Sequence, residues 1–505
     1  MPDVLVIGAG IGGLSAAISL AAAGKSVKVL EAAAEVGGKA GTVIVEGVEI
    51  DTGPTLLTMP EVFDQILGMA GMRLETDAPI HHAERFFQYI WPDGHSLEVH
   101  EVLSCTLGSV EKALGTRARA DLEAFLSYAR KIWEVAEGRF ILGDAPSLKS
   151  LVWLGVAGIK EASALDAWTT MAAAIDKRTV SPYLRTLLAR YATYNGSDPR
   201  RVPATLNCIA HVELARGASA IRGGTYELIR ALHRAAQRLG VDVELGARVD
   251  SIVVEGGAAT GVELADGRRL GARAVVANAD AAHVSGRLLP SSKRRALGDE
   301  AEPSMSGYCF ALRARRRSVQ DRAAHTVLFP VDYRAEFVDI FDRDRPPADP
   351  TVYVCAQEKS HGRAGWAEHE PLFVMVNAPP EPQRGARPPN VWRELELRSL
   401  DRLVRAGLIH ADDEVVWRRS PTELAARFPG SRGAIYGASS NSWNAAFKRP
   451  ANVVAAVPGL FLASGSAHPG GGMPLAALSG LSAARGALRT FESRGARQTP
   501  RTEEK

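Results

Sequence analysis

The sequence has almost no excess of charge of one sign. Its 60 lysines and arginines stand against 57 aspartates and glutamates, which leaves a net charge of +3 at pH 7. A nucleic-acid-binding protein would concentrate basic residues on one face, so we expect no nucleic acid partner. The four cysteines form no C-x-x-C pair, so the spacing typical of a zinc site or a redox pair is missing. We therefore expect no metal. Unpaired thiols are typical of a reducing cytoplasm.

Long apolar helices are also missing, although two uncharged segments are long enough to cross a membrane. Residues 4–24 have no charge, but five of them are glycines. Residues 450–484 contain four prolines and six glycines. Both residue types are poor helix formers. The N-terminus also lacks the basic region and apolar stretch of a secretory signal. We therefore expect a cytoplasmic protein without a transmembrane helix.

The first positive signal is a glycine-rich turn between a strand and a helix. Residues 4–7 form a continuous apolar run, as in a buried parallel strand, and residues 14–23 have the composition of a helix. An acid, Glu31, follows the next apolar run at residues 27–30. In this context glycines let the backbone approach a pyrophosphate, and the acid accepts hydrogen bonds from a ribose hydroxyl. The turn glycines that we assign to the cofactor are Gly8, Gly10, Gly12 and Gly13.

A second glycine group favours FAD over NAD. Gly38 and Lys39 follow Glu31, and Gly53-Pro54-Thr55 follows a predicted hairpin at residues 43–50. The longer FAD molecule extends past the first turn, whereas an NAD-binding domain has no need of this group. The pattern resembles the amine-oxidase-like flavoproteins, and within them the phytoene desaturase family of carotenoid enzymes. That family usually has Arg in place of Lys39, and Lys can neutralise a phosphate but cannot grip it with two parallel hydrogen bonds.

The C-terminal part carries a more specific match. Residues 459–474 resemble the closing segment of that family, in which a strand leads through a glycine bend into a helix. The positive end of that helix would face the flavin ring and stabilise the negative charge of the reduced form. Residues 222–225 and the strand at Val249 resemble two further segments near FAD. The resemblance assigns to the cofactor Gly38, Lys39, Gly53, Pro54, Thr55, Val249, Gly465, Ser466, Met473 and Pro474.

The resemblance covers about residues 1–490 and implies an α/β chain, α+β overall. It predicts a Rossmann-like FAD-binding domain, a mixed-sheet substrate domain and a helical subdomain. Residues 474–480 are most similar to the branch of 1-hydroxycarotenoid 3,4-desaturases, also called methoxyneurosporene dehydrogenases. The expected boundaries are 1–75, 215–290 and 450–490 for the FAD-binding domain, 76–110, 176–214 and 291–449 for the substrate domain, 111–175 for a helical membrane-facing subdomain, and 491–505 for a disordered tail.

No residues in the sequence are placed together as a catalytic triad or a metal cluster. This suits a reaction in which the cofactor carries out the redox step. The resemblance implies that the enzyme desaturates an acyclic carotenoid by hydride transfer to FAD, and 1-hydroxycarotenoid 3,4-desaturation is our first hypothesis. His468 is a candidate acceptor of the proton that is also lost, or else it only orders the glycine bend. Asp51 has a structural interpretation too, as a hydrogen-bonding residue at the end of the hairpin.

Other functions fit the same scaffold. These are phytoene desaturation, non-redox cis–trans isomerisation of a carotenoid, oxidation of an amine, and simple nucleotide carriage. Residues 462–489 contain no aromatic residue to frame a small amine. Two separate flavin-facing segments argue against a carrier. Desaturase and isomerase both stay open, as does the electron acceptor, oxygen or a quinone.

An apolar substrate favours a peripheral position on the inner face of the membrane. A carotenoid that crossed water would forfeit about 25 cal/mol per Å² of apolar surface. Residues 151–159 are the candidate contact, because this apolar run includes Trp153 and is flanked by Lys149 and Lys160. Four arginines could add attraction to anionic lipids or form a solvated strand edge, namely Arg313, Arg315, Arg316 and Arg317.

Overall fold

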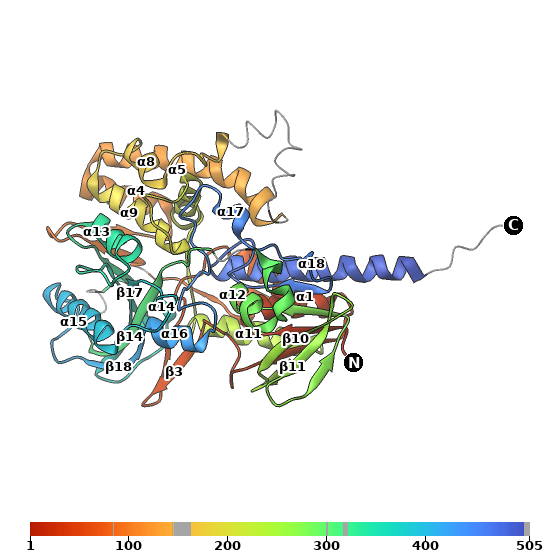
Figure 1. Ribbon diagram of the computed structural model, residues 1–505. Coiled ribbons are helices and arrows are strands. Elements are labelled where there is room, and N and C mark those ends of the chain that lie inside the picture. Colours follow the sequence, from red (N-terminus) through yellow and green to blue (C-terminus); the bar gives the residue numbers. More distant parts are fainter. Residues whose placement is uncertain (84, 144, 146–162, 299–300, 317–321, 499–505) are drawn as a thin grey trace.

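Five parallel strands form the sheet that carries the glycine-rich turn. The computed structural model (Figure 1) describes residues 1–83, 85–143, 145, 163–298, 301–316 and 322–498. The strand order is β19-β13-β1-β2-β9, and each neighbouring pair is parallel. The strands are β1 (Val4–Ile7), β2 (Val27–Glu31), β9 (Asp242–Leu245), β13 (Ala274–Ala277) and β19 (Leu460–Leu462).

The two faces of this sheet bury alternate side chains of β1. Val4 and Val6 belong to the core that includes helices α1 (Ile11–Ala22), α11 (Thr225–Arg238) and α18 (Met473–Gln498). Leu5 and Ile7 belong to a second core with the antiparallel strands β10 (Val249–Glu255), β11 (Ala258–Leu264) and β12 (Arg269–Gly271). Because successive side chains of a strand point to opposite faces, a strand covered on both faces is apolar throughout. The α/β fold with a Rossmann-like sheet is therefore confirmed.

A second, mixed sheet has seven strands in the order β18-β14-β17-β16-β15-β6-β7. The pair β15–β6 is parallel and the other neighbouring pairs are antiparallel. One face packs against α15 (Pro389–Arg405), and the other faces a group of helices. The strands are β6 (Phe87–Ile90), β7 (Ser96–Val99), β14 (Ser306–Arg315), β15 (His325–Leu328), β16 (Val352–Ala356), β17 (His369–Ala378) and β18 (Glu414–Arg419).

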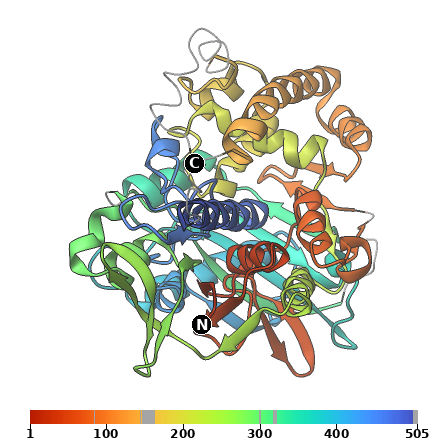
Figure 2. The same cartoon turned by 90° about the vertical axis from the view of Figure 1, so that its right-hand side faces the viewer.

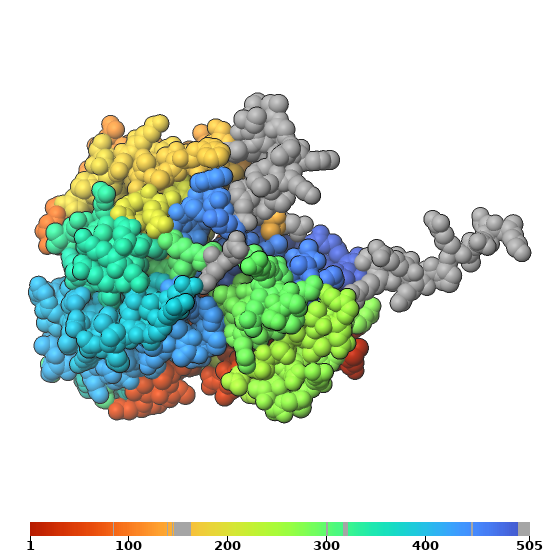
Figure 3. All heavy atoms as spheres, viewed as in Figure 1, coloured from red at the N-terminus to blue at the C-terminus, as the bar shows by residue number. Residues whose placement is uncertain are grey.

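That group of helices forms the third part of the molecule. Figure 3 shows it in orange and yellow, resting on the teal residues of the chain. It continues past the predicted boundary at 175, because α10 and η4 pack back against α5. The predicted domain boundaries themselves stay predictions. The helices are α4 (Leu103–Leu114), α5 (Thr116–Ala136), η1 (Glu137–Ile141), α8 (Met171–Asp176), α9 (Pro182–Ala189), η2 (Arg190–Asn195), η3 (Ala204–Asn207), α10 (Cys208–Ala210) and η4 (His211–Ala215).

Shorter elements join these three parts. The predicted hairpin is confirmed as β3 (Thr42–Val45) and β4 (Val48–Asp51). The remaining elements are α2 (Pro60–Gly68), α3 (Leu74–Asp77), β5 (Ile80–His81), β8 (Ala220–Ile221), α12 (Ala281–His283), η5 (Val284–Leu288), η6 (Ser291–Leu297), α13 (Tyr333–Phe337), η8 (Val338–Asp342), α14 (Gln357–His361), α16 (Pro421–Arg427) and α17 (Ala445–Lys448).

The prediction of a disordered tail from residue 491 is wrong for the first part of that range. Helix α18 continues to Gln498, while residues 499–505 lie outside the described residues. Phe491 is 6% exposed, and the cations of Lys25 and Arg273 lie over its ring. Packing at Phe491 holds the helix, and extending a formed helix by a few residues costs little.

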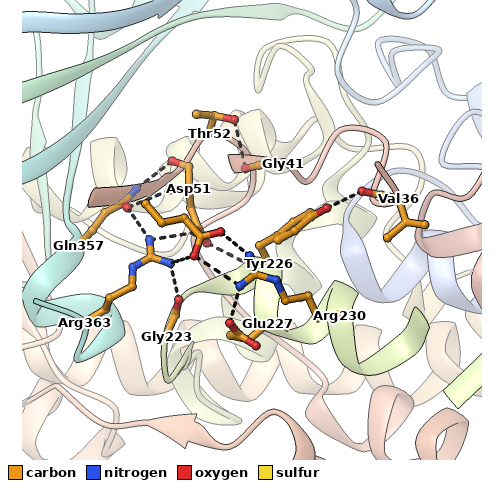
Figure 4. A network of polar contacts seen from close by, with 11 residues as sticks. Val36, Gly41, Asp51, Thr52, Gly223, Tyr226, Glu227, Arg230, Gln357 and Arg363 are labelled. Atoms are coloured by element: carbon orange, nitrogen blue, oxygen red, sulfur yellow. Dashed lines mark hydrogen bonds and ion pairs between the residues drawn. The ribbon is translucent and has the colours of Figure 1, made fainter. Parts of the chain in front are cut away.

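A buried polar network ties the hairpin to α11 and to α14, the helix that follows β16 of the second sheet (Figure 4). The Asp51 carboxylate, 1% exposed, accepts from the backbone N–H of Tyr226 at 3.2 Å and pairs with Arg363 at 3.1 Å. The side-chain amide of Gln357 accepts from the backbone N–H of Asp51 at 3.0 Å and donates to its carbonyl oxygen at 2.8 Å. The interpretation of Asp51 as a hydrogen-bonding residue at the hairpin end therefore accounts for its contacts.

We predict that Asp51 makes the stability of the protein depend on pH. Burial raises the pKa of its carboxyl from 3.8 to about 6, against the opposing charge of Arg363. A raised folded pKa stabilises the protein at low pH, and this contribution is lost as the pH rises through about 6. Relative to Asp51→Asn, the wild type should lose on the order of 1 kcal/mol of unfolding free energy between pH 5 and pH 7. Urea unfolding of both proteins at the two pH values checks this, and a constant difference would contradict it.

Candidate cofactor and substrate site

A cavity of about 1490 Å³ runs from the glycine-rich turn to the second sheet. It lies at the carboxyl ends of β1, β2, β13 and β19, where open parallel sheets bind their ligands. Gly8, Glu31, Asn278 and Ser464 lie at or just after the ends of these strands, and all four residues line the cavity. The cavity is larger than most small-molecule sites, so it has room for a cofactor and a long substrate together.

The four glycines of the turn have different structural roles. Gly10 is the N-cap of α1 and makes no side-chain capping bond, so the first N–H groups of this helix are left to a ligand. A Cβ on Gly12 would lie 2.0 Å from the carbonyl oxygen of Ala463, and one on Gly13 would lie 2.0 Å from that of Gly8. Gly8, Gly10 and Gly12 line the cavity, whereas Gly13 lies behind them and closes the turn.

Glu31 lines the cavity at the end of β2. Its carboxylate accepts from the backbone N–H of Ala9 at 2.6 Å and from that of Ala33 at 2.8 Å. A carboxylate has about four acceptor positions, so it can brace the turn and still accept from ribose hydroxyls. The sequence did not indicate this second role as a brace.

Lys39 reaches across the cavity lining. Its ammonium donates to the carbonyl oxygens of Ala434 at 3.0 Å and Ile435 at 2.7 Å, and burial lowers its pKa. Gly38 beside it has a φ of +62°, which suits glycine. Lys39 therefore joins the turn to the segment after α16. Its predicted contact with a phosphate stays a prediction.

The closing segment lies on the other side of the glycine turn. Helix α18 begins at Met473, with Pro474 in its first turn, and both residues line the cavity with Gly465 and Ser466. A Cβ on Gly480 would lie 2.2 Å from the carbonyl oxygen of Gly12, so α18 packs directly on α1. Both views show these helices side by side (Figure 1, Figure 2). Two helix N-termini thus face one cavity, an arrangement that favours anionic groups.

The remaining predicted residues also lie around this cavity. Gly53, Pro54 and Thr55 line it, as does Val249 at the start of β10. His468 is 4% exposed and lines it too. Its Nε2 lies 3.2 Å from the carbonyl oxygen of Gly143, so the ring links the bend to the helical part. That contact fits the ordering role, and the role as proton acceptor stays a prediction.

Sequence reasoning missed two polar residues of the site. Asn278 follows β13, and its amide donates to the carbonyl oxygen of Ala463. Its position at the end of a buried apolar run was a signal for it. Arg449 donates to the carbonyl oxygens of Gly465 at 2.8 Å and Ala438 at 2.9 Å, and burial lowers its pKa to about 10. No local pattern marked Arg449, because its partners depend on tertiary packing.

The two predicted membrane contacts have different outcomes. Residues 151–159 lie outside the described residues, as does Arg317. The other three arginines each pair with a carboxylate, and this supports the solvated strand edge. The pairs are Arg313–Glu46, Arg315–Asp412 and Arg316–Glu358.

The parallel sheet, the uncapped glycine turn and the second helix N-terminus suit a dinucleotide cofactor. The chain belongs to the family described as flavin containing amine oxidoreductase, whose model matches residues 11–488, and it is an FAD-dependent oxidoreductase. The cofactor predicted from the sequence is therefore confirmed as FAD.

Curated relatives match nearly the whole chain, and a solved structure shares its fold. A hydroxyneurosporene desaturase of Cereibacter sphaeroides is 36% identical over 98% of this chain and 99% of that protein. One from Rubrivivax gelatinosus is 34% identical over 97% and 94%. A 4,4'-diapolycopene oxygenase of Methylomonas is 31% identical over 94% and 96%. Putrescine oxidase bound to putrescine has the same fold, with a TM-score of 0.63 and 16% identity over 97% of this chain and 99% of that one.

We predict that Gly12→Ala weakens FAD binding. The new methyl group would meet a backbone oxygen at 2.0 Å, which would push the closing segment away from the turn. The dissociation constant of FAD should rise about 10-fold or more, a loss of at least 1.4 kcal/mol in binding, and the flavin absorbance per purified polypeptide should fall with it.

Gly68→Ala is the matched control, because no atom lies within 4 Å of a Cβ at that position. It should retain the flavin content of the wild type. A folded Gly12→Ala protein with a full complement of FAD would contradict the assignment.

Proposed function

We propose that this protein is a desaturase that introduces a C=C bond into an acyclic carotenoid, and that it oxidises the 3,4 bond of a 1-hydroxycarotenoid. The observation that carries this proposal is the continuity of one cavity from the cofactor turn to an apolar region. Hydroxyneurosporene desaturases of three species match nearly the whole chain and support the choice of substrate.

The lining beyond the cofactor turn suits a long hydrocarbon. Apolar side chains from the helical part and the second sheet surround it, and an apolar lining excludes water from the reacting bond. A small cationic amine would lose its hydration on this apolar surface. Burying a charge without a partner costs a large amount of free energy. The apolar residues include Leu56, Trp133, Phe140, Ile141, Ile209, Val212, Phe373 and Met375.

The reaction removes two hydrogens from the substrate. The chemistry that FAD supplies when bound is acceptance of a hydride from an allylic C–H bond. The cation that remains is spread over the polyene, and loss of a proton from the neighbouring carbon completes the double bond. His468 is the proposed acceptor of that proton, because its ring lines the cavity and neutral imidazole has one acceptor nitrogen.

The test is turnover of an acyclic 1-hydroxycarotenoid in liposomes by the FAD-loaded protein, with oxygen or a quinone as oxidant. The expected product has lost two hydrogens and absorbs at longer wavelength. A product of unchanged mass but altered geometry would indicate the isomerase instead. Oxidation of amines, with no change in any carotenoid, would contradict the proposal.

The cavity reaches the molecular surface at a pair of tryptophans. Trp168 and Trp443 line it, yet they are 76% and 59% exposed, and their ring centroids lie 5.6 Å apart. Exposed residues that line a cavity mark its mouth. Tryptophan favours the interface between membrane and water, where its ring is partly apolar and its N–H stays hydrated. Among the described residues, no helix is long and apolar enough to span a bilayer.

We therefore propose peripheral membrane association at this mouth, so that a carotenoid passes from lipid into the cavity without crossing water. The double variant Trp168→Glu, Trp443→Glu should bind liposomes about 10-fold more weakly than the wild type in co-sedimentation, because each charge resists entry into the interface. Leu397→Glu is the control, since this exposed leucine of α15 lies outside the cavity lining. If the wild type, the double variant and Leu397→Glu bind liposomes equally, the two tryptophans are not the membrane contact.

A further inference from the structure

A buried polar cluster interrupts the apolar lining of the cavity. Arg190, the first residue of η2, lines the cavity and is 7% exposed. Its Nη1 donates to the phenol oxygens of Tyr89 at 3.3 Å and Tyr194 at 3.0 Å. The Glu213 carboxylate lies 4.0 Å from the guanidinium and balances its charge. A pure hydrocarbon would gain nothing from these groups and would leave them unsolvated.

Tyr333 adds a hydroxyl group from another part of the fold. It is the first residue of α13 and lines the same cavity. Its hydroxyl oxygen is buried, and it has no hydrogen-bond partner among the described residues. Its ring packs edge-on against Phe329 at 5.3 Å, and the ring of Phe329 stacks on Tyr89 at 5.9 Å. Tyr333 and Arg190 are therefore connected through the rings of Phe329 and Tyr89, and both line the cavity.

Helix η2, which carries Arg190 and Tyr194, ends beside the segment that closes the cofactor site. A Cβ on Gly196, just after η2, would lie 2.8 Å from the ring of Tyr436. A Cβ on Gly471, in the glycine bend, would lie 2.6 Å from the same ring. One tyrosine ring thus separates η2 from the bend that leads into α18, and this ring lines the cavity as well.

We propose that Arg190, Tyr194 and Tyr333 form a hydroxyl-binding subsite, which selects carotenoids with a hydroxyl group close to the oxidised bond. This inference rests on the proposed function and specifies how the substrate is chosen. A hydroxyl group accepts two hydrogen bonds and donates one, which matches guanidinium N–H groups and two phenols. The hydroxyl-bearing carbon of a 1-hydroxycarotenoid is two bonds from C3, so its recognition must occur beside the redox centre. A site built around such a hydroxyl rejects the analogue without it, because the polar groups of the site stay unpaired.

The experiment compares an acyclic 1-hydroxycarotenoid with the same carotenoid lacking the hydroxyl, both in liposomes, on FAD-loaded full-length protein. The readout is the ratio of kcat/KM for the two substrates. We expect the wild type to prefer the hydroxylated carotenoid by about 10-fold or more, and Tyr333→Phe and Tyr194→Phe each to lower that preference about 5-fold or more. Tyr183→Phe is the control, because its hydroxyl bonds Asp93 and His95 outside the cavity lining, and it should keep the preference.

The outcomes separate the two proposals. Equal turnover of both carotenoids by the wild type overturns the subsite and leaves desaturation intact. A full preference in Tyr333→Phe and Tyr194→Phe also overturns it. If neither carotenoid is desaturated, the proposed function fails. Binding, followed by quenching of flavin fluorescence, then decides the subsite alone: equal dissociation constants for the two carotenoids overturn it, and a weaker preference in Tyr333→Phe supports it.

Discussion

Helix α18 reaches the cofactor turn because glycines let backbone touch backbone. Gly12 lies against the carbonyl of Ala463, and Gly480 lies against the carbonyl of Gly12. A side chain at either glycine would separate α1 from α18 and open the site between residues that are more than 400 positions apart in the chain. The shared cavity and the orientation of both helix N-termini depend on this contact.

The same contact explains why one cavity can serve cofactor and substrate. Once α18 lies on α1, the glycine bend before it adjoins Tyr436, which in turn adjoins the segment after η2. The helical part and the second sheet are thereby brought to the edge of the cofactor turn. In the proposed function, polar groups near that junction orient the substrate, and the apolar residues of the lining hold its hydrocarbon chain.

Sequence reasoning located the residues whose role follows from local backbone geometry. The glycine turn, Glu31 and the start of α18 at Met473 are such cases, since each depends on the end of one strand or helix. It did not find Arg449 or the cluster around Arg190. Both consist of charged or aromatic residues that resemble an ordinary surface or core until their partners are known.

Local patterns were enough to predict the first strand–turn–helix unit and its cofactor glycines, because these lie within about 30 neighbouring residues. The family followed from several such segments taken together, including the distant residues 459–474. Three contacts emerged from the folded chain alone: Lys39 binds the carbonyls of residues 434 and 435, Glu31 bonds the N–H of Ala9, and Tyr333 and Arg190 line one cavity. Local patterns could not predict them, because hydrogen bonds and burial require proximity in space. Residues distant in the chain acquire their chemical environment only when packing brings them together.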